Sequence, residues 1–237
     1  MSRSSAGILR FKAKVSRALI PGALLSSMLA ACATTPPPPP PPPPPPAPNA
    51  PNGVVLSDWR GVITAADRDR YQRRDAAWTL ALQQAKRQPG SGDLNSLGDL
   101  IDPDAARPSV TPPVGNYRCR TVKLGSQGGE GGLGYVVYGW FACRIEQTPA
   151  GLKFSKLTGS QRPSGLLFPE NDRQMVFLGS MALASEPAAR SYGLRPERDM
   201  VAVVERIGER RWRMVIPWPA NESNLDLIEL VPAPARR

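Results

Sequence analysis

The chain has 237 residues, a net charge of +10 and no histidine, and 28 of its residues are proline. Without histidine, Ser-His-Asp and Cys-His nucleophile systems and imidazole zinc sites are excluded. An enzyme with this composition would have to use carboxylates, lysine, tyrosine or arginine.

The N-terminal residues 1–31 have the pattern of a secretory signal peptide. Five basic residues and no acidic residue lie between Arg3 and Arg17, and a mostly apolar run follows from Ala18 to Ala31. As a helix this run would span about 21 Å, short of the roughly 30 Å hydrocarbon core, so an uncleaved transmembrane anchor is the weaker alternative. Without its five basic leader residues the chain keeps 25 basic and 20 acidic residues, a net charge of +5.

The signal sequence ends in Leu29-Ala30-Ala31-Cys32, which resembles the lipobox of bacterial lipoproteins. The resemblance implies that the sulfur of Cys32 is diacylated, that Cys32 becomes the N-terminus, and that it anchors the chain in a membrane. Ala33 stands where lipoproteins retained in the inner membrane often carry aspartate. We therefore expect a periplasm-facing lipoprotein, in the outer rather than the inner membrane.

Residues 32–53 comprise the cysteine that is expected to be lipidated and a proline-rich segment. It contains eleven consecutive prolines from Pro36 to Pro46. Such a run cannot form helix or sheet and adopts polyproline II, which at about 3.1 Å per residue extends on the order of 34 Å. The segment is interpreted as a stiff spacer; a ligand for an aromatic-lined proline-binding groove is the alternative.

Residues 54–114 have a helical pattern. Thr64 and Asp67 fit a capping box, and Pro89-Gly90 stops the helix. This predicts one amphipathic helix of about 24 residues that packs an apolar stripe on the next domain. The stripe consists of Tyr71, Trp78, Leu82 and Ala85, and residues 94–101 are predicted as a second short helix.

Residues 115–237 change to short strands separated by turns. The predicted strands are 116–124, 135–145, 152–158, 165–168, 174–183, 200–207, 211–217 and 225–231, with a two-residue turn at Gly208-Glu209. The fold class is therefore mainly β (α+β overall): a small antiparallel barrel or sandwich of about eight strands with an N-terminal amphipathic helix. An up-and-down barrel is favoured, because most links are too short for long crossovers.

The two cysteines of this domain, Cys119 and Cys143, lie in the first two predicted strands. An antiparallel hairpin would bring them near one another, and a secreted chain meets an oxidising compartment, so they are predicted to form a disulfide. Free thiols are the alternative. The sequence predicts no cofactor and no metal site, because two cysteines without histidine are a poor ligand set.

A glycine-rich loop lies between these two strands. Residues 129–136 match the pattern G-x-G-x-x-G-x-V of phosphate-covering loops. A kinase would also need an H-R-D sequence, and a dinucleotide-binding loop would need a helix where a strand is predicted. The segment is therefore interpreted as a flexible hairpin tip.

A polar cluster in the segment KLTGSQRPSG is the candidate ligand site. A glycine-broken strand at a barrel rim can present donors to an anionic ligand, although the residues also suit a plain turn. Ser160 and Lys156 would form a Ser-Lys nucleophile pair only if a bend brought them together, because four residues of strand span about 13 Å. The cluster consists of Lys156, Thr158, Ser160, Gln161 and Arg162.

Arginine greatly outnumbers lysine after the predicted signal peptide, with 21 Arg against four Lys. Arginine suits bidentate contacts to carboxylate or phosphate, although the excess also fits codon usage. Arginines flank both cysteines and crowd the last hairpin. They are Arg118, Arg120, Arg144, Arg206, Arg210, Arg211 and Arg213.

Several segments together resemble a known family. They are GNYRCRTVKLG, YVVYGWFACRI, KLTGSQRPSG, FLGSMAL, YGLRPERD, VVERIGERRWRMVIPWP and ESNLDLIELVP. From about Asp58 onward the chain is similar to the alphaproteobacterial domain of unknown function numbered 4893. The resemblance implies that the helix and the β-domain form one module, and it implies no activity, ligand or catalytic residue.

Two functional classes follow from these patterns. The preferred one is a non-enzymatic envelope lipoprotein that reaches a membrane through its lipid anchor and binds an envelope protein, a cell-wall polymer or a lipid, but no nucleic acid. The alternative is an envelope hydrolase or transferase that uses Ser-Lys or carboxylate chemistry, and no catalytic residue is assigned to it. The candidate carboxylates are Glu205, Glu229, Asp199 and Asp226, of which strand alternation places Glu205 and Asp199 on one face.

Overall fold

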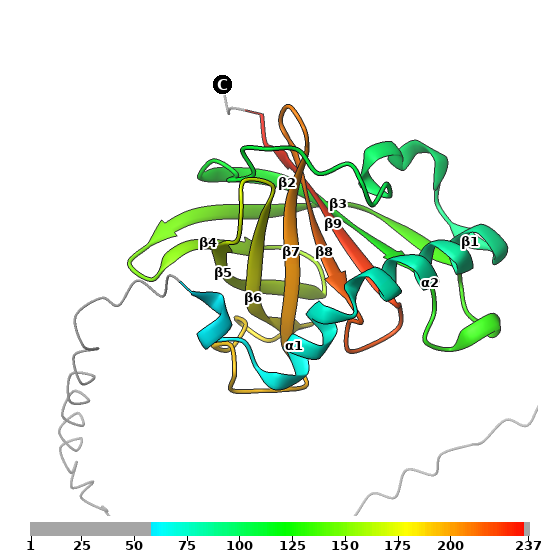
Figure 1. The fold of residues 1–237 in the computed structure, drawn as a ribbon, viewed down its shortest axis with the longest axis horizontal. Helices are drawn as coiled ribbons and strands as arrows, with labels where there is room; N and C mark the ends of the chain where they lie inside the picture. Colours follow the sequence, from blue (N-terminus) through cyan, green and yellow to red (C-terminus); the bar gives the residue numbers. More distant parts are fainter. Residues whose placement is uncertain (1–57, 235–237) are drawn as a thin grey trace, which may run out of the picture. The chain divides into compact units, whose positions relative to one another are not determined.

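The computed structural model describes residues 58–234; the predicted signal peptide, Cys32 and the proline-rich segment lie outside the described residues. The described part is a closed antiparallel β-barrel with helices on its outer surface (Figure 1). The barrel strands are β2 (Gly115–Leu124), β3 (Tyr135–Thr148), β4 (Gly151–Lys156), β5 (Gln161–Pro169), β6 (Gln174–Leu183), β7 (Asp199–Gly208), β8 (Arg211–Pro217) and β9 (Leu225–Pro232).

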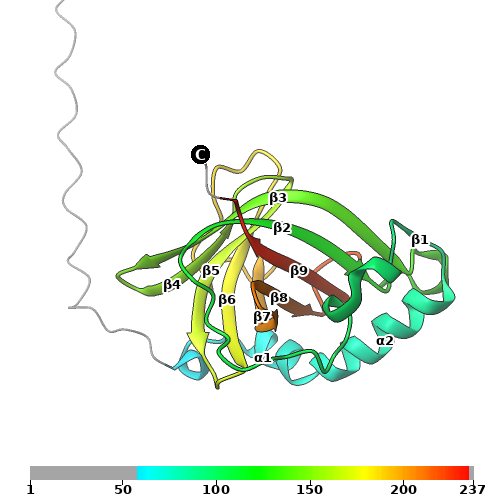
Figure 2. The ribbon, with the colours of Figure 1, turned by 90° about the horizontal axis from the view of Figure 1, so that it is seen from above.

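Every barrel strand pairs with its neighbours in sequence. β2 pairs with β3, and so on to β9, which returns to pair with β2 along eight residues of register, and all these pairings are antiparallel. The predicted up-and-down barrel of eight strands is thus confirmed. An additional two-residue strand, β1 (Gly90–Ser91), pairs in parallel with the start of β3 (Figure 2).

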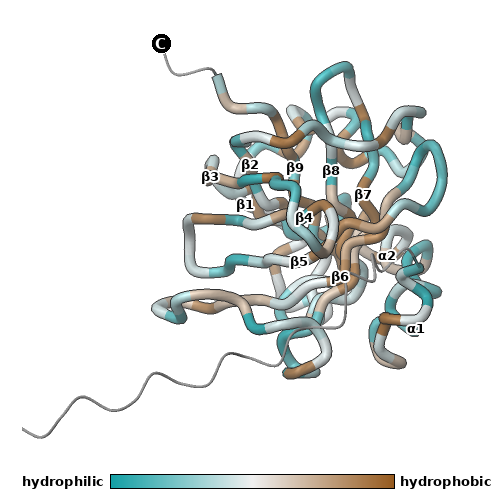
Figure 3. The backbone as a smooth tube through the Cα atoms, turned by 90° about the vertical axis from the view of Figure 1, so that its left-hand side faces the viewer, coloured by the Kyte–Doolittle hydropathy of each residue, from teal (hydrophilic) through white to brown (hydrophobic). Residues whose placement is uncertain are grey.

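The inner core of the barrel is made by alternate residues of each strand, because successive side chains of a strand point to opposite faces. Cys119 and Cys143 both lie in this core, on neighbouring strands, and form the predicted disulfide with a Cα–Cα distance of 5.9 Å. Two T-shaped aromatic pairs, Tyr117 with Trp212 and Phe154 with Phe177, fill the interior beside them. Figure 3 shows hydrophobic stretches on strands such as β6 and β7 and hydrophilic residues on many of the loops.

Two α-helices cover part of the outer surface. α1 (Ala65–Gln72) begins at the predicted cap, where Thr64 accepts a hydrogen bond from the backbone N–H of Asp67, and α2 (Arg74–Arg87) follows directly. The prediction of one continuous helix was wrong: Arg73 has φ −93° and ψ 14° and separates the two. This break lets α1 pack on β7 while α2 packs on β2, β8 and β9.

A second core lies between α2 and the barrel. Of the predicted stripe, Trp78 and Ala85 are buried there, whereas Tyr71 and Leu82 are partly buried at its border. Ala77 and Ala81 are completely buried, because small side chains let the helix approach the strands closely. The barrel contributes outward-facing apolar residues to this core, among them Val122, Leu124, Val203, Val215, Leu225 and Leu227.

The segment after α2 is held to the barrel by one buried arginine. The 3-10 helix η2 (Asn95–Leu100) occupies the predicted short helix. Arg213, on the outer face of β8, is completely buried, pairs with Glu205 at 2.7 Å, and donates to four backbone carbonyls of this segment. The carbonyls belong to Asp99, Leu100, Asp102 and Pro103.

Candidate functional site

The two ends of the barrel differ in the length of their loops. At one end, the strands are joined by turns of two to four residues, 149–150, 170–173 and 209–210. The opposite end carries the longer loops 125–134, 184–198 and 218–224, together with the four-residue turn 157–160. We refer to these as the short-turn end and the long-loop end. Long loops on a rigid barrel commonly carry binding residues, so a binding site is expected at the long-loop end.

The short-turn end is closed by the chain segment that leads into β2. Trp212 donates its indole N–H to the carbonyl of Val110 at 2.7 Å, and the hydroxyl of Tyr117 donates to the carbonyl of Pro113 at 2.6 Å. Val110 itself is 4% exposed and belongs to the inner core. This segment therefore seals the barrel interior at that end.

The long-loop end holds a cavity of about 150 Å³, which we call the mouth cavity. A neighbouring cavity of about 60 Å³, the side cavity, shares Lys123 and Gln161 with it and is bordered by the inward-facing Met181, Met200 and Ile216. The residues around the mouth cavity combine charged, hydroxyl and aromatic groups. They are Thr121, Lys123, Tyr138, Phe141, Lys156, Ser160, Gln161 and Glu222.

Lys123 points inward because it continues the alternation of Tyr117 and Cys119 along β2. Its Nζ lies 3.0 Å from Asp226 Oδ2, on the opposite residue of β9, and 3.1 Å from Glu222 Oε2. Burial alone would lower the pKa of Lys123, but the charges and hydrogen bonds of Asp226 and Glu222 outweigh burial and raise that pKa. Asp226 is further held by the hydroxyl of Ser223, which donates to it.

Lys156 lies at the end of β4 and is only 6% exposed. Its Nζ donates to the backbone carbonyls of Thr158 at 3.1 Å and Gln161 at 2.8 Å, and lies 3.7 Å from the centre of the Phe141 ring. Within residues 58–234, no carboxylate forms an ion pair with it. Burial, followed by the positive charges of Arg162 and Lys123, lowers the pKa of Lys156 to about 8.

Only three of the five residues of the predicted polar cluster border the mouth cavity. Lys156, Ser160 and Gln161 border the mouth cavity. Thr158 instead accepts a hydrogen bond from the backbone N–H of Ala142. Arg162 donates to the carbonyls of Gly159, Ala184 and Glu186, so it ties the turn 157–160 to the loop 184–198.

The turn 157–160 supplies the bend that a Ser-Lys pair requires. It brings Ser160 and Lys156 to the same cavity. The Nζ atom of Lys156, however, is hydrogen-bonded to two carbonyls and, in the part of the chain that the structure describes, not to the hydroxyl of Ser160.

The outward carboxylates and arginines pair with one another. Glu229 on β9 contacts Arg120 on β2 and Arg211 on β8, so it links three neighbouring strands where the barrel closes. Arg118 and Arg120 both lie over the ring of Trp140, 4.8 and 5.0 Å from its centroid. These three arginines therefore make contacts within the protein.

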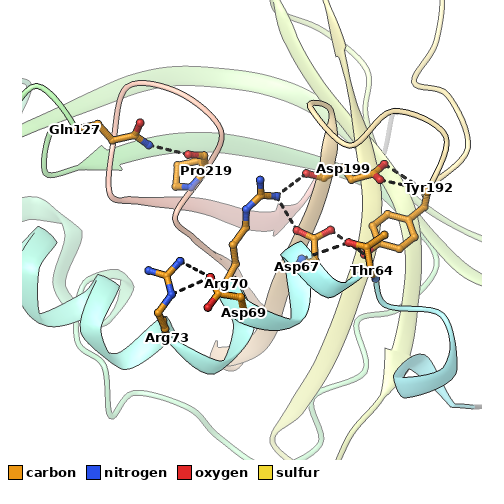
Figure 4. A network of polar contacts seen from close by, with 10 residues as sticks. Thr64, Asp67, Asp69, Arg70, Arg73, Gln127, Tyr192, Asp199 and Pro219 are labelled. Atoms are coloured by element: carbon orange, nitrogen blue, oxygen red, sulfur yellow. Dashed lines mark hydrogen bonds and ion pairs between the residues drawn. The ribbon is translucent and has the colours of Figure 1, made fainter.

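A network of polar contacts fixes the loop 184–198 to α1 beside the long-loop end (Figure 4). Tyr192 donates to Asp67 at 2.7 Å, and Arg70 pairs with the same carboxylate at 2.7 Å and donates to the carbonyl of Asp199. Asp199 accepts from the backbone N–H of Gly193, and burial raises its pKa. Asp199 and Glu205 both lie outside the inner core along β7, as their spacing predicted, but they have different partners.

The glycine-rich loop packs against the end of α2 and against the loop 218–224. The backbone N–H of Gln127 donates to the carbonyl of Glu222, and its side chain donates to the carbonyl of Pro219 (Figure 4). A Cβ atom at Gly134 would lie 2.7 Å from the carbonyl oxygen of Gln84, so glycine is needed for this close approach.

Five residues of the mouth cavity were not predicted from the sequence: Thr121, Lys123, Tyr138, Phe141 and Glu222. The inward position of Lys123 could have been read from the alternation of β2. Glu222 reaches Lys123 only because of the conformation of the loop 218–224. In this loop the backbone of Glu222 has a positive φ of 74°, which residues other than glycine rarely adopt.

The fold and this cavity define an eight-stranded up-and-down barrel, closed at one end and with a lysine-containing cavity at the other. The family model described as Domain of unknown function (DUF4893) matches residues 59–230, which is most of the chain. The chain belongs to this family. No curated protein and no solved structure gives a significant match to it.

No helix between residues 58 and 234 is long and apolar enough to cross a membrane. The same residues contain no group of three or more cysteine or carboxylate side chains placed to hold a metal ion.

Proposed function

We propose that the protein is a membrane-anchored envelope lipoprotein whose barrel is a non-enzymatic binding module, with the long-loop end as its binding face. The signal sequence, the lipobox ending at Cys32 and the polyproline spacer support the anchored location. The disulfide between Cys119 and Cys143 supports an oxidising compartment. An outer-membrane location is proposed from Ala33.

The observation that supports binding most directly is the environment of Lys156. A buried ammonium group without a counter-ion is costly, and stable folds rarely keep one without a use. Here it borders a cavity at the end of the barrel that carries the long loops, whereas the other end is sealed by Trp212 and Val110. Apolar side chains fill the middle of the barrel, so a small ligand would be held in the mouth cavity at this end.

Binding at the long-loop end is tested by photo-crosslinking at two exposed positions. A diazirine amino acid is placed at Leu157, in the turn beside the mouth cavity, and separately at Val114, beside the sealed end; the two side chains are 45% and 60% exposed. We expect adducts of defined mass from Leu157 but not from Val114 after irradiation of intact envelopes. Equal labelling of the two positions, or none at Leu157, would contradict the proposal.

The anchor is tested separately. We expect the variant Cys32→Ser to remain an unprocessed precursor that incorporates no palmitate during metabolic labelling. Normal palmitate incorporation by this variant would show that Cys32 is not the lipidated residue. Membrane fractionation of the labelled wild-type protein distinguishes the outer from the inner membrane.

A second candidate function is a hydrolase or transferase that uses Ser160 as nucleophile and Lys156 as base. The observation in its favour is that both residues border the mouth cavity and that Lys156 has a lowered pKa of about 8. Binding is preferred because both hydrogen bonds of Lys156 Nζ go to carbonyls. Covalent labelling of the wild-type protein by a fluorophosphonate, abolished by Ser160→Ala, would support the enzyme instead.

A further inference from the structure

We infer that the mouth cavity binds a small aliphatic monocarboxylic acid, whose carboxylate lies between Lys156 and Lys123 and replaces the side chain of Glu222. This inference rests on the proposed binding function and names the class of ligand for the same site.

The need for an anion follows from the charges around the cavity. Lys156 and Lys123 both border it, and each is less than 8% exposed. Lys123 has the buried partner Asp226, whereas Lys156 has only carbonyl oxygens and the face of the Phe141 ring. A bound carboxylate would give Lys156 the charged partner that this part of the chain does not supply, in a site where such hydrogen bonds are strong.

Glu222 shows that a carboxylate fits beside Lys123. Its carboxylate lies 3.1 Å from Lys123 Nζ, and its side chain is 57% exposed. The backbone of Glu222 is held by the N–H of Gln127, so the side chain can turn into solvent while the loop 218–224 stays in place. When it does, Lys123 keeps its ion pair with Asp226 and gains a free donor toward the cavity.

The charge and the size of the site favour a small monoanion. With Glu222 turned away, the charge of Asp226 balances one of the two lysines, and a ligand with a single negative charge balances the other. A phosphate dianion would leave the site with an excess negative charge. The mouth cavity of about 150 Å³ is smaller than the roughly 300–1,000 Å³ of sites for drug-sized ligands. Phe141 and Tyr138 border this cavity, and Met181, Met200 and Ile216 border the adjoining side cavity, so the rest of the ligand meets apolar groups.

The test is calorimetric titration of the full-length protein, in detergent, with butyrate and with inorganic phosphate at constant ionic strength. We expect butyrate to bind and phosphate to bind more weakly. Lys156→Met should weaken butyrate binding about tenfold or more, because it removes a charged hydrogen bond. Glu222→Gln should tighten butyrate binding about threefold, because it removes the exposed carboxylate that competes with the ligand for Lys123.

Lys153→Met is the matched control. Lys153 lies on the same strand, three residues earlier, but its side chain is 39% exposed and pairs with Glu146 on the surface. We expect this variant to bind butyrate as the wild type does. Circular dichroism and the midpoint of thermal unfolding show whether each variant is folded.

Three results would overturn the inference: no binding of butyrate by the folded wild type, tighter binding of phosphate than of butyrate, or equal binding by Lys156→Met and the wild type. These results are separable from failure of the proposed function. If Leu157 crosslinks to a ligand in envelopes while butyrate does not bind, only the ligand class is wrong. If Leu157 also gives no adduct, the binding function itself fails.

Discussion

The Nζ atom of Lys156 lies 3.7 Å from the centre of the Phe141 ring, inside the end of the barrel. The ring offers a cation some compensation for lost hydration, but less than a carboxylate would. Burial is the largest of the effects that lower the pKa of Lys156 from 10.5 to about 8, so its charge should influence stability at mildly alkaline pH.

The stability of the folded protein should therefore depend on pH in this range. Between pH 8 and 10.5 the unfolded chain keeps a proton on Lys156 that the folded protein has released, so the free energy of unfolding rises with pH. The rise should be on the order of 1 kcal/mol per pH unit at most, and it should be missing in Lys156→Met. Urea unfolding at pH 7.5, 8.5 and 9.5 measures it; parallel pH profiles of the two proteins would disprove the assignment.

The disulfide between Cys119 and Cys143 should contribute strongly to stability. It closes a loop with a sequence separation of 24 residues, and a cross-link of this length stabilises a fold by roughly 3 kcal/mol through the unfolded chain. We expect the double variant Cys119→Ala, Cys143→Ala to lose stability by about this amount in urea unfolding. Added reductant should destabilise the wild type and leave the double variant unchanged, and two free thiols in protein isolated without reductant would refute the disulfide.

Arg213 should be far more important to the fold than its neighbour Arg210. Arg213→Met leaves the buried carboxylate of Glu205 without its cation and several carbonyls without a donor, which costs about 3–5 kcal/mol. Arg210 lies exposed in the turn 209–210, and Arg210→Met should change stability by less than about 0.5 kcal/mol. Guanidinium unfolding followed by tryptophan fluorescence compares the two; similar losses in both would contradict the role given to Arg213.

Tyr192 should hold the loop 184–198 against α1. Its hydroxyl donates to Asp67 at 2.7 Å and accepts from the backbone N–H of Thr64 at 3.0 Å. Tyr192→Phe removes both contacts, and a hydrogen bond to a charged group is worth about 1.5–3 kcal/mol. We expect trypsin to cleave this arginine-containing loop faster in the variant. Tyr138→Phe, which alters a tyrosine 40% exposed, is the control; equal cleavage rates in all three proteins would show that Tyr192 does not restrain the loop.

Much of the barrel could be predicted from the sequence because its strands alternate regularly and their links are short. All eight predicted segments overlap strands, although β5 is longer than the predicted 165–168 and β4 ends before the predicted 158. The disulfide followed from the hairpin that contains both cysteines. The turn after β7 was placed one residue too early: Gly208 pairs with Arg211, so the turn is formed by Glu209 and Arg210.

The candidate site was harder to predict, because it depends on register and on loop conformation. Strict alternation from Phe141 would turn Val137 inward. A register shift in β3, opposite Thr121, instead turns Val137 toward α2 and leaves Tyr138 beside the mouth cavity. The pair of Lys123 with Asp226 joins residues 103 positions apart, and only the pairing of β2 with β9 brings them together.

That pairing of the first and last barrel strands also sets the order in which the fold can be completed. Seven of the eight barrel strand pairs join neighbours in sequence, but β2 also pairs with β9, about a hundred residues later. Long-range pairing of this kind slows folding. Until Leu225–Pro232 have been synthesised, β2 has one unpaired edge, which is a template for aggregation. Loss of the last strand would therefore open the barrel along its whole length and remove the ion pair of Glu229 with Arg120. The closed barrel thus depends on residues 225–232.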